Sequence, residues 1–182
     1  MYESKLRLLS RPSMADEPPY KGECVMANRK YQECKASVGD AISGAFGDLT
    51  TLAEECREVV DNVSGTPLEN TARNQTMGET ADTLEGLSEP DVDDDRLNAI
   101  MVTWMEIQPR NKRAPLSRSD RRDNAIAALD AALNALIEKK DALEEADKTD
   151  DNELVDVIDS LINDLEQIKG EAEGVEFPGM RG

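Results

Sequence analysis

The first half of the chain carries one long run of apolar positions at helical spacing. Between Arg29 and Val63 they recur at intervals of three and four, with one extra interval of four: Tyr31, Cys34, Val38, Ala41, Ala45, Leu49, Leu52, Cys56, Val59 and Val63. This stripe predicts a long amphipathic helix with a single stutter, packed in a bundle. Gly39, Gly44 and Gly47 weaken its middle, so we expect either a kink or a closely packed second backbone.

Glycine and proline positions indicate where the next elements begin and end. Gly65 is expected to end the first helix as the residue just beyond its C-cap. Residues 66–69 (Thr-Pro-Leu-Glu) have the pattern of a helix start, and Thr76 to Glu79 repeats that pattern. We therefore expect a short turn and then a helix that reaches Leu87, before Pro90.

The hydrophobic period changes at residues 99–107, which form the only convincing strand in the sequence. Apolar residues alternate between two faces there, with Ile100, Val102 and Trp104 opposite Met101, Met105 and Ile107. A lone strand cannot satisfy its own backbone, so we expect it to pair with a second copy of the chain or with another protein's sheet edge. The alternative is a short helix or an extended segment lying over the helices.

The C-terminal half predicts two amphipathic helices joined by a polar turn at residues 147–152. Asp150 and Glu153 supply a cap for the second helix, and Lys140 is the single polar residue that interrupts the first apolar face. Such a pair forms an antiparallel αα-hairpin. The two apolar faces consist of Ile126, Leu129, Leu133, Leu136, Leu143 and Ala146, and of Leu154, Val157, Leu161, Leu165, Ile168, Ala172 and Val175.

These elements predict a mainly α protein: a long N-terminal amphipathic helix, one short central strand and a C-terminal αα-hairpin. Lys21-Gly22-Glu23 can be encoded by a purine-rich, ribosome-binding-like sequence just before Met26, so both Met1 and Met26 are candidate starts. The units are a disordered tail (1–25), a helical unit (26–90), an acidic loop with strand and basic linker (91–118), the hairpin (119–176), and a short tail (177–182). The segment from Val175 to Gly182 is expected to fold back as a cap on the bundle, with docking to a partner as the alternative.

Composition restricts the core and the classes of partner. Only 3% of the residues are aromatic and 38% are apolar, which suits slender helical packing. The 39 acidic residues exceed the 21 basic ones, giving a net charge of −18. That charge argues against direct binding of nucleic acid or of an anionic membrane and favours a protein partner with a basic surface.

Candidate chemistry is sparse, and we assign no catalytic residue, metal site or cofactor. Histidine is absent, the three cysteines lack a CxxC spacing, and no apolar run approaches the roughly 18 residues of a membrane span. Asp91 to Asp95 resembles the start of a calcium loop, but Arg96 replaces its glycine and Val102 its glutamate. We expect a non-enzymatic cytoplasmic protein.

Acidic residues dominate two zones, and ten of them are our candidate partner-binding residues. Residues 79–98 carry a net charge of −7 and residues 119–176 carry −12, while the linker at 109–118 carries +4. Along residues 150–176 a helix would present one carboxylate per roughly 4 Å, close to the phosphate spacing of a DNA strand of about 3.4 Å. The candidates are Asp93, Asp94, Asp95, Asp150, Asp151, Glu153, Asp156, Asp159, Asp164 and Glu166.

Three interpretations of this acidity are open. The face can mimic nucleic acid and occupy a basic cleft, it can be a solvated surface, which is the commoner case for acidic helices, or it can reflect a salt-adapted host. The basic residues around the linker are expected to neutralise the acids of this chain, or of another copy, more than to grip phosphates. They are Arg110, Lys112, Arg113, Arg118, Arg121 and Arg122.

Three stretches resemble small acidic helical proteins of unassigned function encoded by tailed bacteriophages, over most of residues 26–180. The resemblance implies a host bacterial cytoplasm and an accessory or counter-defence role, and it brings no catalytic residues. We thus expect an acidic interaction protein, with a helical homo-oligomer as the alternative. The stretches are Ala45-Phe46-Gly47-Asp48-Leu49 with Leu52-Ala53-Glu54-Glu55; Ala81-Asp82-Thr83-Leu84-Glu85 with Ser88-Glu89-Pro90-Asp91-Val92; and Val175-Glu176-Phe177-Pro178-Gly179-Met180.

Overall fold

A computed structural model describes residues 30–92, 94–109, 115–145 and 152–178, and it confirms the mainly helical class. The proposed tail at 1–25 lies outside the described residues, as does most of the polar turn at 147–152. The described elements, in chain order, are β1 (Lys30–Ser37), α1 (Val38–Val63), α2 (Ala72–Glu85), α3 (Asp95–Asn98), β2 (Met101–Gln108), α4 (Arg118–Glu145) and α5 (Asn152–Gly174).

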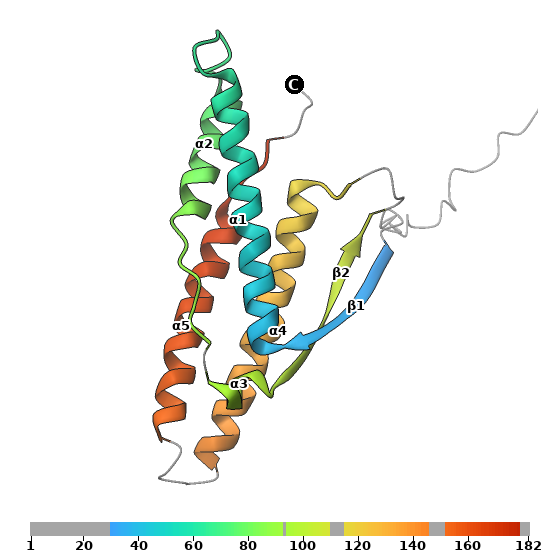
Figure 1. The fold of residues 1–182 in the computed structure, drawn as a ribbon, viewed down its shortest axis with the longest axis vertical. Coiled ribbons are helices and arrows are strands. Elements are labelled where there is room, and N and C mark those ends of the chain that lie inside the picture. Colours follow the sequence, from blue (N-terminus) through green and yellow to red (C-terminus); the bar gives the residue numbers. More distant parts are fainter. Residues whose placement is uncertain (1–29, 93, 110–114, 146–151, 179–182) are drawn as a thin grey trace, which may run out of the picture.

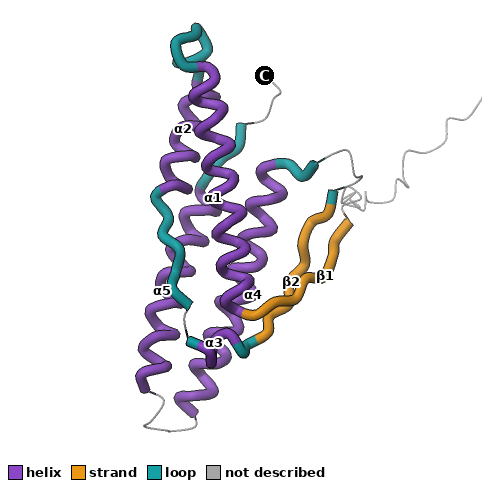
Figure 2. Tube along the Cα trace, in the orientation of Figure 1, coloured by secondary structure: helices purple, strands orange, loops and turns teal. Residues whose placement is uncertain are grey.

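The long helices form an elongated bundle, and the sheet stands along one side of it (Figures 1 and 2). α1 packs against α2 and α4, while α4 also packs against α5 and β2. α5 runs antiparallel to α4 on the side of the bundle away from the sheet. The main core lies where α1, α4 and α5 meet, and its fully buried large side chains include Ile42, Leu49, Leu52, Leu129, Leu136, Ile158 and Leu165.

The helix predicted from Arg29 is wrong over its first turns, because residues 30–37 form strand β1. β1 pairs with β2 in antiparallel register, from Lys30 opposite Gln108 to Ser37 opposite Met101. The predicted strand exists at Met101–Gln108, but its partner is this same chain instead of a second copy or another protein. Pairing supplies backbone hydrogen bonds that outweigh the helical spacing of the few apolar residues in this stretch.

Helix α1 starts and ends at defined polar and glycine positions. The Ser37 side chain accepts a hydrogen bond from the Asp40 N–H at 3.1 Å, and Gly65 has a φ of 73°, which confirms its predicted role beyond the C-cap. A Cβ on Gly39 would overlap the Asn98 side chain, whereas one on Gly44 would meet nothing. Of these glycines, only Gly39 in the first turn of α1 is closely packed against another element.

Residues 66–69 close a turn and do not start a helix. The Glu69 carboxylate accepts from the Gly65 N–H at 2.9 Å, and the Thr66 hydroxyl accepts from the Leu68 N–H at 3.2 Å. α2 begins at Ala72, after Thr71 caps it by accepting from the Asn74 N–H. The expected turn therefore precedes α2, which starts before the second capping pattern at Thr76 and ends at Glu85, two residues short of Leu87.

Residues 175–178 pack against the bundle, and the rest of the predicted cap, residues 179–182, lies outside the described residues. Phe177 packs against both buried clusters, and its ring centroid lies 6.0 Å from the Arg122 guanidinium. The Thr80 hydroxyl donates to the Glu176 carbonyl at 2.8 Å, and Arg122 donates to the Val175 carbonyl at 2.8 Å. These contacts attach the segment to α2 and α4.

Candidate interaction surface

The acidic residues that precede β2 are used locally. Asp94 is the N-cap of α3, accepts from the Arg96 N–H at 2.8 Å, and forms an ion pair with the Arg96 guanidinium at 2.7 Å. The Arg96 side chain lowers the pKa of Asp94. Asp95 lies exposed in the first turn of α3, and Asp93 lies outside the described residues. Asp94 is therefore committed to α3 and is a poor candidate for partner binding.

The predicted carboxylates of α5 are spread around its exposed surface. Helical spacing places Asp156 opposite the buried stripe of α5, while Glu153 and Asp164 lie on one margin of the exposed surface, beside that stripe. Asp159 lies on the flank that faces α4 and is half-buried. Glu166 is on the same flank but exposed. Asp150 and Asp151 lie outside the described residues.

Two lysines neutralise the acids along the seam between α4 and α5. Lys140 lies 2.6 Å from Asp159, and Lys169 lies 2.6 Å from Asp130. Each lysine also reaches a carboxylate on its own helix at 3.7 Å, Glu144 for Lys140 and Glu173 for Lys169. These carboxylates raise the pKa of both lysines, with the Asp159 and Asp130 hydrogen bonds as the largest causes. Lys140 and Lys169 thus neutralise carboxylates between α4 and α5.

The outward acids of α5 lack such compensation. Glu153, Asp156, Asp164 and Glu166 are exposed, and none has an ion pair with a described residue. Val157, one helical turn from Glu153, is 44% exposed. The surface we call the α5 acidic face, made of Glu153, Asp156, Asp164 and Val157 together with Glu166 on the flank nearer α4, therefore combines uncompensated negative charge with a small apolar contact.

A second acidic row on α4 was not among the predicted candidates. Glu138, Asp141 and Glu145 are exposed, and their spacing of three and four places them on one face of the helix. No described cation pairs with them. The spacing of Glu138, Asp141 and Glu145 can be read from the sequence, but the candidates were chosen from the denser acidic run after residue 150.

The basic residues at the start of α4 bind acids of this chain, in agreement with the expectation from sequence. Glu55 of α1 accepts from Arg121 at 2.6 and 2.7 Å and from Arg118 at 3.1 Å. The Arg121 hydrogen bond is the largest cause that lowers the pKa of Glu55. Arg110, Lys112 and Arg113 lie outside the described residues.

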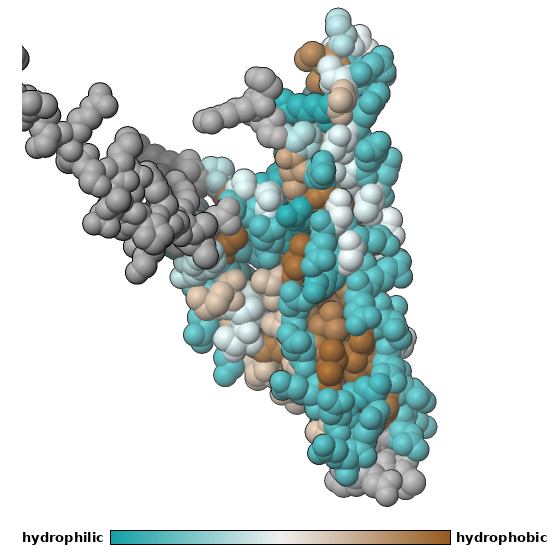
Figure 3. All heavy atoms as spheres, turned by 180° about the vertical axis from the view of Figure 1, so that it is seen from behind, coloured by the Kyte–Doolittle hydropathy of each residue, from teal (hydrophilic) through white to brown (hydrophobic). Residues whose placement is uncertain are grey.

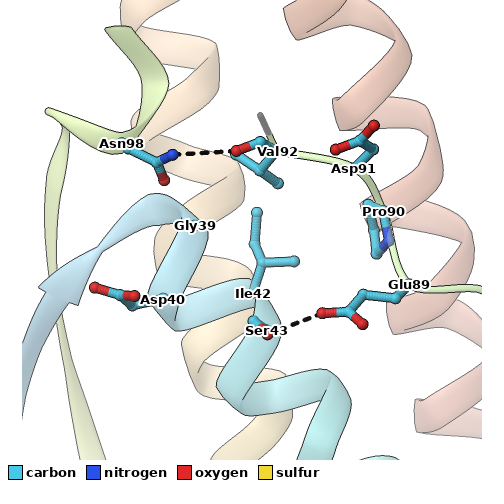
Figure 4. Close-up of a pocket in the computed structure, with 9 residues that line it drawn as sticks. All are labelled: Gly39, Asp40, Ile42, Ser43, Glu89, Pro90, Asp91, Val92 and Asn98. Carbon is cyan, nitrogen blue, oxygen red and sulfur yellow. Dashed lines mark hydrogen bonds between the residues drawn. The ribbon is translucent and has the colours of Figure 1, made fainter. Parts of the chain in front are cut away.

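An open cleft of about 460 Å³ lies between the first turns of α1 and the segment before α3 (Figure 4). Asp40, Glu89 and Asp91 contribute carboxylates to it, and the Ser43 hydroxyl donates to Glu89 at 2.8 Å. No basic side chain lines the cleft among the described residues. It can receive a cationic group, and we assign it no ligand.

The two described cysteines have thiols that resist ionisation. Cys56 is fully buried in the small cluster with Met77 and Ala81, and burial is the main cause that raises its pKa. Cys34 lies half-buried on β1, and burial followed by a hydrogen bond to Glu106 raises its pKa. Cys56 is a core residue, as its place on the apolar stripe indicated.

Comparisons with known proteins give no relative: no family model, no curated protein and no solved structure matches the chain. Within the described ranges, no group of three or more acidic or cysteine side chains is arranged to hold a metal ion. Nor does any helix of the described part have the length and apolar character needed to cross a membrane.

Proposed function

We propose that this chain is a non-enzymatic interaction protein that binds a basic surface of another protein through the α5 acidic face. One observation carries the proposal. Lys140 and Lys169 neutralise acids at the seam with α4, while the four carboxylates of the α5 acidic face have no described cation. Like charges on one exposed helix repel each other, most strongly between the neighbours Glu153 and Asp156, and a cationic partner relieves that repulsion.

The finer form of this proposal is nucleic-acid mimicry in a bacterial cell, in an accessory or counter-defence role for a phage. Glu153, Asp156 and Asp164 lie exposed along one helix, α5. Most of the molecular face seen in Figure 3 is hydrophilic, with a hydrophobic patch in its lower half. Along the helix axis the three carboxylates of α5 are about 4.5 and 12 Å apart, so a basic cleft that accepts a DNA backbone would meet a sparser row of negative charge. Under this form, double-stranded DNA competes with the chain for its partner.

The test neutralises the face without changing its shape. The full chain carrying Glu153→Gln, Asp156→Asn, Asp164→Asn and Glu166→Gln is compared with wild type in capture from a bacterial lysate at about 50 mM salt, with elution at about 500 mM. We expect the wild type to retain a basic protein that salt elutes and the variant to lose it. A matched control neutralises four exposed acids of α1 and α2: Glu54, Glu58, Asp61 and Glu79.

The outcomes separate the proposal from a nonspecific effect of net charge. Retention by the control variant together with loss by the α5 variant supports the α5 acidic face. Equal loss by both variants would show that only total charge matters, and binding that is indifferent to salt would contradict the proposal. Release of the captured protein by DNA supports mimicry, and failure of DNA to compete contradicts that finer form alone.

A further inference from the structure

Strand β1 has a free edge that no described element covers. β1 lies at the outer margin of the molecule, with β2 on one side and no described segment on the other (Figures 1 and 2). The Val38 N–H donates to the Ile100 carbonyl at 2.9 Å, which continues the β1–β2 register by one residue. The even-numbered residues of β1 therefore bond to β2, because bonding alternates along an antiparallel strand.

The odd-numbered residues Tyr31, Glu33 and Lys35 consequently direct their N–H and C=O groups to the free edge. All three are exposed, and none forms an ion pair or a further backbone bond with a described residue. No proline or bulge interrupts the eight residues of β1. An edge of this kind is a template for another strand.

We propose that β1 pairs antiparallel with β1 of a second copy, about a two-fold axis at Cys34, to give a four-stranded sheet. In this register Glu33 of each copy lies opposite Lys35 of the other, so two opposite-charge pairs form at the centre. The neighbouring registers of matching bonding pattern place Glu33 against Glu33 or Lys35 against Lys35. Opposite charges stabilise a cross-strand pair and like charges destabilise it, so charge selects the Cys34-centred register.

The surroundings of the edge favour a second copy over a strongly charged partner. β1 contains two lysines and one glutamate and β2 a single glutamate, so the sheet is neutral in a chain of net charge −18. The outer face of the sheet also exposes Tyr31 by 53%, Met101 by 54% and Met105 by 51%. Pairing aligns Tyr31 of one copy with the row that holds Ser37 and Met101 of the other. Two acidic chains therefore repel each other less at this neutral sheet than at the acidic face of α5.

The first experiment measures the mass of the full chain by light scattering over a range of concentrations up to about 100 µM. Wild type is expected at twice the 20.0 kDa of one chain. Lys35→Glu places four acids at the centre and is expected to weaken the dimer about tenfold or more, as is Glu33→Lys. The matched control Lys30→Glu makes the same charge change opposite uncharged Val38, and it is expected to remain dimeric.

Mixing and crosslinking then test the register. Equal amounts of Glu33→Lys and Lys35→Glu are expected to form a mixed dimer. The first variant has lysine at both positions and the second has glutamate at both, so each lysine of one chain lies opposite a glutamate of the other. The doubly exchanged chain is expected to regain the wild-type dimer, which excludes misfolding as the cause. In a Cys24→Ser background, mild oxidation is expected to join Cys34 to Cys34, since facing residues in a non-hydrogen-bonded pair lie within disulfide reach.

Several results would overturn the proposal. They are a monomer at every concentration, Lys35→Glu as dimeric as wild type, or a mixture of the two single variants that stays monomeric. A dimer that persists without a Cys34 crosslink would place the contact elsewhere. The α5 acidic face lies on the other side of the bundle, so loss of the dimer leaves its binding test unaffected (Figure 1).

Discussion

The buried side chain of Asn124 hydrogen-bonds both backbone groups of Ile107. Its amide nitrogen donates to the Ile107 carbonyl at 3.0 Å, and its amide oxygen accepts from the Ile107 N–H at 2.7 Å. Asn124 is 8% exposed and lies on α4, so it completes the edge of β2 that faces the bundle. One side chain thus takes the place of a neighbouring strand, and it attaches the sheet to the helices.

Replacing Asn124 by Ala should destabilise the chain strongly. The Ile107 N–H and C=O would remain buried without partners, and we expect the free energy of unfolding to fall by about 2–4 kcal/mol. Urea unfolding followed by circular dichroism measures this change. Asn134→Ala makes the same substitution at an exposed position of α4 and should change the value by no more than about 0.5 kcal/mol. Equal effects of the two substitutions would contradict the docking role of Asn124.

Alanine at two glycines of α1 should have opposite effects. At Gly39 the new Cβ would displace the exposed Asn98 amide, whose nitrogen donates to the Val92 carbonyl at 3.1 Å, so loss of that bond should cost about 0.5–1 kcal/mol. At Gly44 the Cβ meets nothing, and removal of glycine from a helix should add about 0.5–1 kcal/mol. Thermal unfolding of both variants checks the signs, and a stabilised Gly39→Ala would refute the packing of Asn98 on α1.

The Glu55 ion pairs should make the chain acid-sensitive. Arg121 holds the pKa of Glu55 below its usual value of 4.5, so this stabilisation is complete above pH 4.5 and is lost as pH falls through the lowered value. Glu55→Gln should cost about 1 kcal/mol at neutral pH and flatten the loss of stability below pH 4.5. Urea midpoints across pH measure this, and exposed Glu54→Gln should leave the pH profile unchanged.

Truncating Phe177 should loosen the junction of α2, α4 and the C-terminal segment. The ring packs against both buried clusters and against Arg122, so Phe177→Ala should cost about 1–3 kcal/mol. The control Leu68→Ala, at a side chain that is 58% exposed, should change stability by no more than about 0.5 kcal/mol. Denaturant unfolding compares the two, and a neutral Phe177→Ala would show that the segment is not a cap.

The sequence by itself determined the helices with long amphipathic faces. The apolar stripes of α1 after Val38, of α4 and of α5 repeat at three and four residues, and burial of such stripes is decided mainly within the helix. Gly65 likewise specified its own place, because a left-handed residue favours glycine whatever surrounds it. For Phe177, an apolar residue after a polar helix end, the sequence favoured a return to the bundle but left docking to a partner open.

Tertiary structure alone decided the elements whose stability depends on distant partners. Residues 30–37 became a strand because residues 101–108, far along the chain, supply their backbone hydrogen bonds. Tertiary structure also decided which acids form ion pairs, because the sequence does not show which carboxylates lie near a lysine of another helix. Only the fold brings Lys140 to Asp159 and Lys169 to Asp130, while Glu153, Asp156 and Asp164 on the exposed surface of α5 keep no described cation. Local periodicity fixes a helix face, and only packing fixes which charges meet.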